Sequence, residues 1–322
     1  MSGLANDVLL VSDTVWRDHG TQISEIAPDL EVVVYEGDEP IDDERLAAVT
    51  LAFFSSDTWP DRSRGIVVSI LKSPHLRWLQ TFSAGVDSPF FVDLMRKGVR
   101  LTTASGATAS PIAQTAIMYM LALSRDLRSW MRAQDAREWS RHTFDELDGA
   151  SLAVVGMGPI GREIARLAAA LGMRVEAVRR TPTGDDPWPV HGMDALDGVL
   201  ARSRWVACAL PLNDDTRGIF DARRFALMPE GAYFVNVGRG ELVDEDALVS
   251  ALKSGHLGGA GLDVFAVEPL PAESPLWAMD NVIVTPHNSG STTSTGGRSV
   301  GIFLDNLARL AEGRPLVNEA TL

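Results

Sequence analysis

Short apolar runs alternate with stretches of helical hydrophobic spacing through most of this 322-residue chain. Among the first hundred residues, four runs have the length of buried strands: 8–11, Glu31–Tyr35, Leu51–Phe54 and Trp78–Thr81. Amphipathic stretches lie between them and indicate helices. Strands that alternate with helices predict a parallel sheet that helices cover on both faces.

A long helical pattern interrupts this alternation at positions 111–135. Pro111 suits the first turn of a helix, where its missing N–H is not needed. We expect one continuous helix here, which connects two α/β units and offers a surface for dimerisation.

A second series of strands and helices follows. Strands are expected at Ser151–Val155, Arg174–Val178, 205–210, 233–237, 259–264 and 282–285. Helices are expected at 160–171, 244–254 and 299–312. A chain of this length exceeds what one hydrophobic core usually holds. The pattern therefore predicts an α/β protein with two doubly wound parallel-sheet (Rossmann-like) domains.

Composition excludes several classes of function. The formal net charge of −14 argues against binding to nucleic acid or to an anionic membrane surface. The one cysteine, Cys208, lies in an apolar run, so we expect an inert core thiol and neither a disulfide nor a cysteine-based metal site. Positions 1–13 lack the pattern of a secretory signal, and no apolar run reaches the ~18 residues of a membrane span. We expect a cytoplasmic protein.

The best-defined motif is a glycine-rich turn between a predicted strand and a predicted helix. Gly156, Gly158 and Gly161 fit G-x-G-x-x-G, with Pro159 and Ile160 between the last two glycines. The first glycine permits a tight turn, the second lets the backbone approach a pyrophosphate, and the third lets helix and strand pack closely. The N-terminus of the helix faces the anion. This context predicts a dinucleotide site.

The next predicted strand is followed by Arg179, Arg180 and Thr181. NAD-binding units usually place an acid near this point, where it accepts the ribose 2′-hydroxyl. The nearest acid, Glu176, lies three residues before Arg179 and points to the opposite face of the strand. Two guanidinium groups and a hydroxyl suit a 2′-phosphate instead. We therefore expect NADP in preference to NAD, without excluding NAD; the alternative is two solvated arginines on a loop.

Three ionisable residues, Arg239, Glu268 and His287, each lie just beyond a predicted strand of the second unit. The carboxyl ends of parallel strands form the ligand crevice of such a sheet, so we expect these side chains to meet. Each residue alone has an ordinary alternative: a solvated arginine, a surface acid, a structural histidine.

These residue types suit the reduction of a small 2-oxo acid by hydride transfer to C2. His287 can give a proton to the carbonyl oxygen near neutral pH. Glu268 can stabilise the imidazolium and fix its tautomer. Arg239 offers forked donors for the substrate carboxylate and the polarised carbonyl. The expected enzyme is a nicotinamide-dependent oxidoreductase.

Five motifs in a fixed order resemble those of the D-isomer-specific 2-hydroxyacid dehydrogenase family. They are V-G-M-G-P-I-G at 155–161, L-P-L-N-D-D-T at 210–216, N-V-G-R-G at 236–240, L-D-V-F-A-V-E-P at 262–269 and T-P-H at 285–287. The resemblance covers nearly the whole chain. The family carries its catalytic arginine, glutamate and histidine on the last three motifs, which implies these roles for Arg239, Glu268 and His287.

The resemblance implies further contacts with substrate and cofactor. Backbone amides of Ala84, Gly85 and Val86 would receive the substrate carboxylate, beside Arg239 and His287. Asp263 would contact the nicotinamide carboxamide. Other cofactor-binding residues would be Leu210, Pro211, Thr216, Val237 and Gly238.

The resemblance also implies the domain organisation. Residues 1–104 and 288–322 would form a substrate-binding domain, and residues 105–287 an inserted dinucleotide-binding domain, with a cleft between the two. The dinucleotide-binding domain would form a homodimer. The segment 268–277 is similar to the glyoxylate/hydroxypyruvate reductase branch, which commonly prefers NADPH. Where small apolar residues commonly follow the histidine, this chain has Asn288-Ser289-Gly290.

Two alternatives stay open. One is a reductase for a bulkier 2-oxo acid, for which Phe54, Ser55 and Trp139 are candidate pocket walls. The other is a dinucleotide-sensing binding protein, like the corepressors that share this fold, because fold alone does not establish catalysis.

Overall fold

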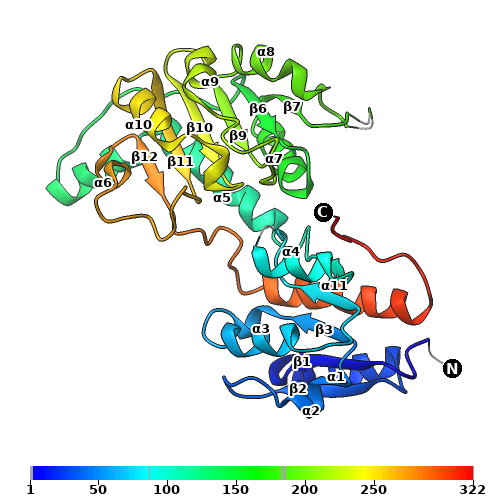
Figure 1. Ribbon diagram of the computed structural model, residues 1–322. Coiled ribbons are helices and arrows are strands. Elements are labelled where there is room, and N and C mark those ends of the chain that lie inside the picture. Colours follow the sequence, from blue (N-terminus) through cyan, green and yellow to red (C-terminus); the bar gives the residue numbers. More distant parts are fainter. Residues whose placement is uncertain (1–2, 87, 183, 185, 322) are drawn as a thin grey trace. The chain divides into compact units, whose positions relative to one another are not determined.

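The structure, a computed structural model, describes residues 3–86, 88–182, 184 and 186–321. The chain divides into two compact units, Met1–Thr108 with Thr292–Leu322, and Ala109–Ser291 (Figure 1). Each unit holds one parallel sheet between layers of helices, so the predicted fold class of two parallel-sheet α/β domains is confirmed.

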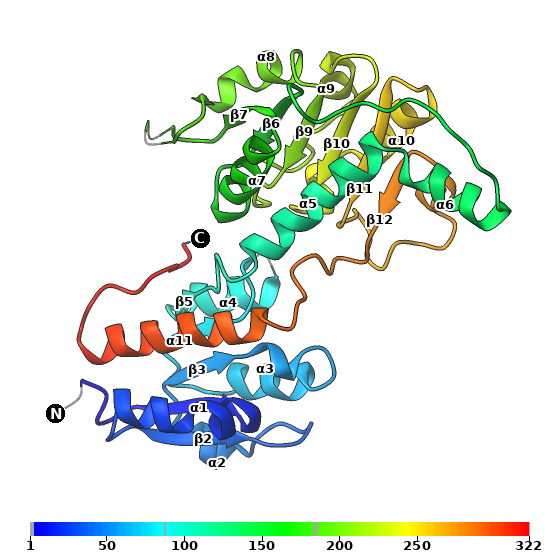
Figure 2. The same ribbon diagram turned by 180° about the vertical axis from the view of Figure 1, so that it is seen from behind.

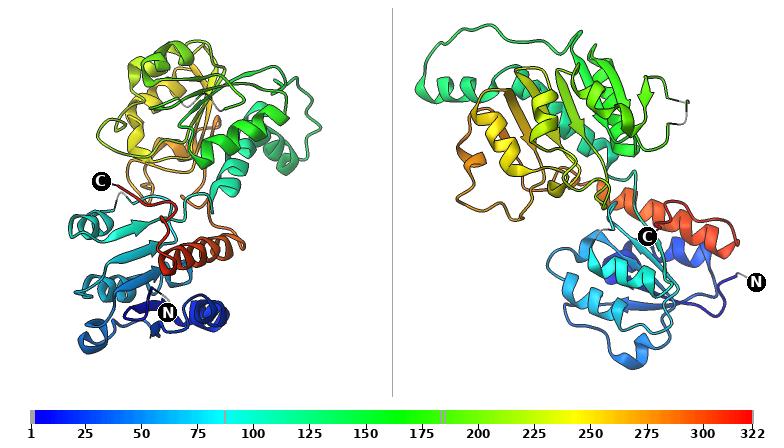
Figure 3. Two further views of the ribbon diagram at one scale, coloured as in Figure 1. Left: turned by 90° about the vertical axis from the view of Figure 1, so that its right-hand side faces the viewer. Right: turned by 45° about the horizontal axis from the view of Figure 1, so that its top comes forward.

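The first unit is built on a five-stranded parallel sheet in the order β2-β1-β3-β4-β5. Its strands are β1 (Val8–Ser12), β2 (Glu31–Tyr35), β3 (Leu51–Phe54), β4 (Trp78–Thr81) and β5 (Arg100–Thr102). Its helices are α1 (Asp13–Ile26), α2 (Asp43–Leu46), α3 (Ser63–Leu71), α4 (Pro89–Arg96) and α11 (Thr295–Ala311), with a 3-10 helix at Ser56–Thr58. Helix α11, in red, lies beside α1 although the two are far apart in sequence (Figure 3).

Alternate residues of these strands face opposite helical layers. Leu9 and Val11 of β1 pack in one buried cluster with residues of α1 and α11, including Phe303 and Leu307. Leu10 packs in the other cluster, with residues of α3 and α4. Because helices cover both faces of the sheet, β1 is buried at every position and apolar from Val8 to Val11.

The second unit contains a seven-stranded parallel sheet in the order β12-β11-β10-β9-β6-β7-β8. Its strands are β6 (Ser151–Val155), β7 (Arg174–Val178), β8 (Val190–His191), β9 (Trp205–Cys208), β10 (Ala232–Asn236), β11 (Leu257–Leu262) and β12 (Val282–Val284). Its helices are α5 (Ala109–Ser124), α6 (Leu127–Ala136), α7 (Pro159–Ala170), α8 (Leu196–Leu200), α9 (Ala222–Leu227) and α10 (Glu245–Lys253), with 3-10 helices at Met193–Ala195, Gly240–Leu242 and Pro275–Ala278. The strand order reverses between β6 and β9, the position at which doubly wound sheets bind dinucleotides.

The sheet of the second unit is also buried on both faces. Leu152 and Val154 of β6 pack with α5 and α7, which lie side by side (Figure 2). Ala153 and Val155 face the layer formed by α8, α9 and α10. Cys208 is buried on the same face of the sheet as Ala153 and Val155. Burial raises the pKa of its thiol to about 12, as expected for an inert core cysteine.

The prediction of one helix across positions 111–135 is wrong, because the structure has two helices, α5 and α6, in this segment. Asp126 lies between them with φ +47°, and its side chain caps the first turn of α6. Arg128 donates from Nη1 to the carbonyls of Met279 and Val282 at 2.7 and 2.8 Å, which ties α6 to the end of the sheet. Hydrophobic spacing continues across this break, so the sequence pattern could not reveal it.

Candidate active site

The glycine-rich turn joins β6 to α7 at the point where the strand order reverses. Gly156 has φ +104°, a conformation that side-chain-bearing residues rarely adopt. At Gly161, an added Cβ would lie 1.8 Å from the carbonyl oxygen of Gly156, so only glycine lets the helix approach the strand this closely. The glycines therefore have the structural roles that a dinucleotide turn requires.

The N-terminus of α7 suits an anionic group. Gly158 is the N-cap residue and Pro159 is in the first turn, and no side chain caps the helix. The first amides of a helix lack intrahelical acceptors and carry partial positive charge. Together with the turn at Gly156, this end of α7 fits the pyrophosphate of a dinucleotide.

The structure places Arg179 immediately after β7, half-buried, whereas Arg180 and Thr181 are exposed. An acid that the sequence analysis did not single out lies against this point. Asp186, with a side chain only 1% exposed, accepts a hydrogen bond from Arg162 of α7 and has an oxygen 3.7 Å from Nη1 of Arg179. Asp186 lies 24 residues after Arg162, in a loop without periodicity, so spacing gave no signal for this cluster.

Glu176 is bound to other residues. Its carboxylate accepts hydrogen bonds from Arg202 at 2.5 and 3.1 Å and lies 2.9 Å from Nε2 of His191. The hydrogen bonds from Arg202 lower the pKa of the Glu176 carboxyl, against a smaller effect of burial that raises it. Glu176 thus belongs to an ion-pair cluster with Arg202 and His191, and Arg179 is not part of this cluster.

Glu268 and His287 form a hydrogen-bonded pair. Nδ1 of His287 lies 2.7 Å from Oε2 of Glu268, and Oε1 of Glu268 accepts the N–H of Phe265 at 3.0 Å. The backbone N–H of Phe265 thus orients the carboxylate, and the carboxylate in turn orients the imidazole. The side chain of His287 is 46% exposed, and its Nε2 makes no hydrogen bond or ion pair with the described residues. The pair can therefore present Nε2 to a ligand.

The main chain of His287 is held in an unusual conformation, with φ +49°. Its N–H donates to the carbonyl of Asp263 at 2.8 Å. The buried carboxylate of Asp263 accepts the N–H groups of Asn288 and Ser289 at 3.1 and 3.2 Å, and also the hydroxyl of Ser289. Asp263 thus fixes the turn that carries the imidazole, a role that the sequence analysis did not foresee.

A hydroxyl chain extends this network into the helical layer. Thr285 donates to Asp263 at 2.5 Å, and the hydroxyl of Tyr119 on α5 lies 2.5 Å from the Thr285 hydroxyl. Because the single Thr285 proton goes to Asp263, Tyr119 is the donor to Thr285. Burial raises the pKa of Tyr119, so the phenol keeps the proton that it donates.

Arg239 follows β10 and precedes a 3-10 turn. Asn236 braces the segment, because its Nδ2 donates to the Arg239 carbonyl at 2.9 Å and its Oδ1 accepts the Gly238 N–H at 3.0 Å. Nη1 of Arg239 donates to the Gly238 carbonyl at 2.8 Å. The side chain is half-buried, and Val237 beside it is almost fully buried. Arg239, Glu268 and His287 follow β10, β11 and β12, which are neighbours in the sheet.

The loop after β9 is closed by Thr216. Its hydroxyl donates to the carbonyl of Pro211 at 2.7 Å and accepts the N–H of Asn213 at 2.9 Å. Leu210 is 8% exposed at the start of this loop. The side chain of Thr216 therefore shapes the loop from within.

Ala84, Gly85 and Val86 lie in the first unit, in the loop that follows β4. The Ser83 hydroxyl donates to the carbonyl of Gly85 at 2.9 Å. Among the described residues, the three backbone N–H groups of Ala84, Gly85 and Val86 have no acceptor. Adjacent unpaired amides can bind a carboxylate.

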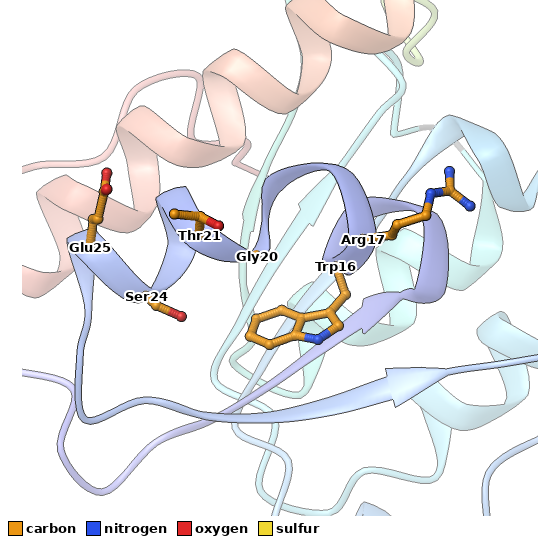
Figure 4. Close-up of a pocket in the computed structure, with 6 residues that line it drawn as sticks. All are labelled: Trp16, Arg17, Gly20, Thr21, Ser24 and Glu25. Carbon is orange, nitrogen blue, oxygen red and sulfur yellow. The ribbon is translucent and has the colours of Figure 1, made fainter.

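The candidate pocket walls differ in their exposure to solvent. Phe54 and Ser55 are 5% and 2% exposed and lie in the core of the first unit, while Trp139 of the second unit is 94% exposed. A hollow of about 620 Å³ on α1 is lined by Trp16, Arg17 and other residues of that one helix, and contains none of the candidate site residues (Figure 4). In the part of the chain that the structure describes, no cluster of His, Cys, Asp and Glu could hold a metal ion, and no helix is long and apolar enough to cross a membrane.

Comparisons with known proteins give the family. The model of the family "D-isomer specific 2-hydroxyacid dehydrogenase, NAD binding domain" matches residues 117–289, within the second unit. The glyoxylate/hydroxypyruvate reductase B of Escherichia fergusonii is 36% identical over 252 residues, which cover 75% of this chain and 77% of that protein.

Solved structures of the same family are similar along the whole chain. A D-isomer specific 2-hydroxyacid dehydrogenase from Xanthobacter autotrophicus Py2, in complex with NADPH and MES, has a TM-score of 0.79 at 30% identity and covers 100% of this chain and 98% of its own. An NADPH-dependent glyoxylate/hydroxypyruvate reductase from Sinorhizobium meliloti, in complex with NADP and sulfate, has a TM-score of 0.77 at 27% identity, with 98% of both chains covered.

The chain therefore belongs to the D-isomer specific 2-hydroxyacid dehydrogenase family, as its motifs indicated. It is an NAD(P)-dependent oxidoreductase.

Proposed function

We propose that this protein reduces a short 2-oxo acid of the glyoxylate or hydroxypyruvate type to the 2-hydroxy acid, reversibly, with NADPH as the preferred cofactor and NADH as a weaker one. The observation that carries the proposal is the 2.7 Å contact between His287 Nδ1 and Glu268, which leaves Nε2 of the imidazole for the substrate. The names of the relatives, glyoxylate/hydroxypyruvate reductases, support the substrate class.

In the proposed reaction, His287 gives a proton from Nε2 to the carbonyl oxygen of the substrate as C2 is reduced. Glu268 accepts from Nδ1, which keeps the proton on the ring nitrogen that faces Glu268 and stabilises the imidazolium before transfer. Arg239 binds the substrate carboxylate and the carbonyl oxygen, where negative charge develops. The bound nicotinamide supplies the hydride. In the reverse direction, His287 removes the hydroxyl proton.

The cofactor would be held by the second unit. The glycine turn and the N-terminus of α7 fit the pyrophosphate, and Arg179, Arg180 and Thr181 fit a 2′-phosphate. The buried Nη1 of Arg179 has no hydrogen-bond partner among the described residues, so a further acceptor would be favourable there. Leu210, Pro211, Val237 and Gly238 are proposed to line the nicotinamide side, with Thr216 shaping their loop.

The substrate carboxylate is proposed to bind the unpaired amides of Ala84, Gly85 and Val86. The first unit is accordingly proposed as the substrate-binding domain and the second as the dinucleotide-binding domain. Asp263 is proposed to act mainly through the turn of His287, because its carboxylate already accepts hydrogen bonds from Thr285, Asn288 and Ser289.

A homodimer through the second unit is also proposed. Helices α5 and α6 expose Met118, Leu121, Trp130 and Met131 by 39–57% and border an apolar hollow of about 490 Å³. Such a patch is typical of a surface that a partner covers. Light scattering should give twice the chain mass, and Leu121→Asp should shift it toward the monomer. A cytoplasmic location is part of the same proposal.

The activity is tested by mixing the protein with NADPH and a panel of 2-oxo acids and following the absorbance of reduced nicotinamide. We expect turnover with glyoxylate and hydroxypyruvate to exceed that with branched or aromatic 2-oxo acids. A preference for the larger acids would replace the proposed substrate by a bulkier one. Binding of NADPH without turnover on any acid would favour a dinucleotide-sensing protein.

A further inference from the structure

A carboxylate of the protein itself lies against the two arginines at the end of β7 and the start of α7. Asp186 accepts a hydrogen bond from Nη1 of Arg162, and its other oxygen lies 3.7 Å from Nη1 of Arg179. The Asp186 side chain is 1% exposed, whereas those of Arg162 and Arg179 are 44% and 26% exposed. The acid is therefore buried beside two arginines whose side chains are partly exposed.

The fit between this carboxylate and the two arginines is incomplete. Oδ2 of Asp186 and Nη1 of Arg179 are both buried and both lack a hydrogen-bond partner among the described residues. At 3.7 Å they are too far apart for a hydrogen bond, although they attract each other as charges. Buried polar atoms without partners are unfavourable, so an acceptor of another shape between these arginines would be stabilised.

The place of the cluster indicates which acceptor that is. Arg162 directly follows the last glycine of the turn, and Arg179 directly follows β7, the strand next to β6. In dinucleotide-binding units, the group at the end of this second strand contacts the 2′ position of the adenosine ribose. A phosphate offers three acceptor oxygens and close to two negative charges, which suits two arginines better than one carboxylate does.

We propose that Asp186 is an internal competitor for the 2′-phosphate of NADP(H). Its carboxylate binds Arg162 and Arg179 in the free protein, and the 2′-phosphate binds by displacing it. NADH carries a 2′-hydroxyl, cannot displace the acid and binds with Asp186 in place. Asp186 thus lowers the affinity for NADP(H) alone, and Arg162 joins Arg179 as a 2′-phosphate ligand. This inference rests on the proposed preference for NADPH.

The test uses two fragments that lack nicotinamide, so it does not depend on catalysis. Binding of adenosine 2′,5′-bisphosphate and of 5′-AMP is measured by titration calorimetry on the whole protein. Asp186→Asn keeps the shape of the side chain and removes its charge. We expect the bisphosphate to bind roughly tenfold more tightly to this variant, which corresponds to about 1.4 kcal/mol. The affinity for 5′-AMP should stay within about twofold.

Two further variants serve as comparisons. Asp194→Asn removes the same charge from an exposed side chain of the same unit that has no ion pair among the described residues, and it should leave both affinities unchanged. Arg162→Ala should weaken bisphosphate binding about tenfold and leave 5′-AMP binding unchanged. Retained 5′-AMP binding also shows that each variant keeps its fold.

The outcomes separate this inference from the proposed cofactor preference. If the unaltered protein binds the bisphosphate more tightly than 5′-AMP but Asp186→Asn changes neither affinity, the competitor role is overturned and the preference stands. If Asp186→Asn weakens 5′-AMP binding, the acid accepts the ribose hydroxyl and the competitor role is likewise overturned. If the unaltered protein does not distinguish the fragments but Asp186→Asn does, the competitor role holds and the preference for NADPH fails.

Discussion

The backbone carbonyl of Asp263 accepts the N–H of His287 at 2.8 Å, while the Asp263 side chain holds the two residues that follow the imidazole. One buried residue at the end of β11 thereby fixes the backbone of a residue beyond β12. A histidine at φ +49° is strained unless its surroundings determine that conformation. Two neighbours thus position His287, the proton donor of the proposed reaction. Glu268 holds the imidazole ring of His287, and Asp263 holds its main chain.

Replacing Asp263 by asparagine tests this positioning role. The amide group would turn a donor toward the donors of Ser289, so we expect a loss of about 1–3 kcal/mol in the free energy of unfolding. Turnover should fall roughly ten- to hundredfold as the imidazole loses its place. Ser289→Ala removes one of these hydrogen bonds and should have a smaller effect in the same direction. Denaturant unfolding and steady-state kinetics measure both, and an unaffected turnover in Asp263→Asn would show that the turn does not depend on this carboxylate.

Glu268→Gln should move the pH profile of kcat/KM toward acid. Glutamine can still accept the Phe265 N–H, but it is neutral and no longer stabilises a charged imidazolium beside it. Glu273→Gln, an exposed acid of the same segment, is the matched control. A profile identical to that of the unaltered enzyme would remove Glu268 from proton transfer.

Arg239→Lys separates charge from geometry. Lysine keeps the positive charge but loses the fork that binds a carboxylate and a carbonyl oxygen together. We expect KM to rise and kcat to fall together, with kcat/KM about 10²-fold lower, because the contact acts in both ground and transition states. Arg217→Lys, at an exposed arginine paired with Glu241, should change neither constant. A rise in KM alone would confine Arg239 to substrate binding.

Glu176→Gln should affect stability and leave cofactor choice unchanged. Hydrogen bonds from Arg202 lower the pKa of the Glu176 carboxyl in the folded state, so the ionised group stabilises the fold above its unfolded pKa. This contribution is lost as the pH falls through the folded pKa, below the usual 4.5. Because the pair is partly exposed, we expect a difference of less than about 1 kcal/mol at neutral pH that vanishes in acid. The affinities for NADPH and NADH should be unchanged. A selective loss of NADH binding would show that Glu176 contacts the ribose of the cofactor.

The strands and the glycine turn could be predicted because their signals are local. The run 152–155 is apolar at every position because both faces of β6 are covered, and Gly156 directly follows it. Helix α4 and strand β5 were missed because they are short. The break at Asp126 was missed because it depends on a cap and on a contact with the end of the sheet.

The candidate site shows the same division between local and long-range signals. The contact between Glu268 and His287 could be predicted because β11 and β12, the strands that precede them, are neighbours in the parallel sheet. The contact of Asp186 with Arg162 and Arg179 could not be predicted, because it joins a loop without periodicity to a helix 24 residues away. The hydrogen bonds of Asp263 could not be predicted either. The sequence does not distinguish an aspartate that is buried and structural from one that binds a ligand.

The central claim is that His287 is the proton donor, and its direct test is the variant His287→Ala. Turnover of NADPH with glyoxylate and calorimetric binding of NADPH are measured on the same preparation, beside His256→Ala, whose imidazole contacts the Phe225 carbonyl instead. We predict that His287→Ala lowers kcat by roughly 10²–10⁴-fold while NADPH binding and the activity of His256→Ala stay close to those of the unaltered enzyme. Turnover that survives in His287→Ala would contradict the account.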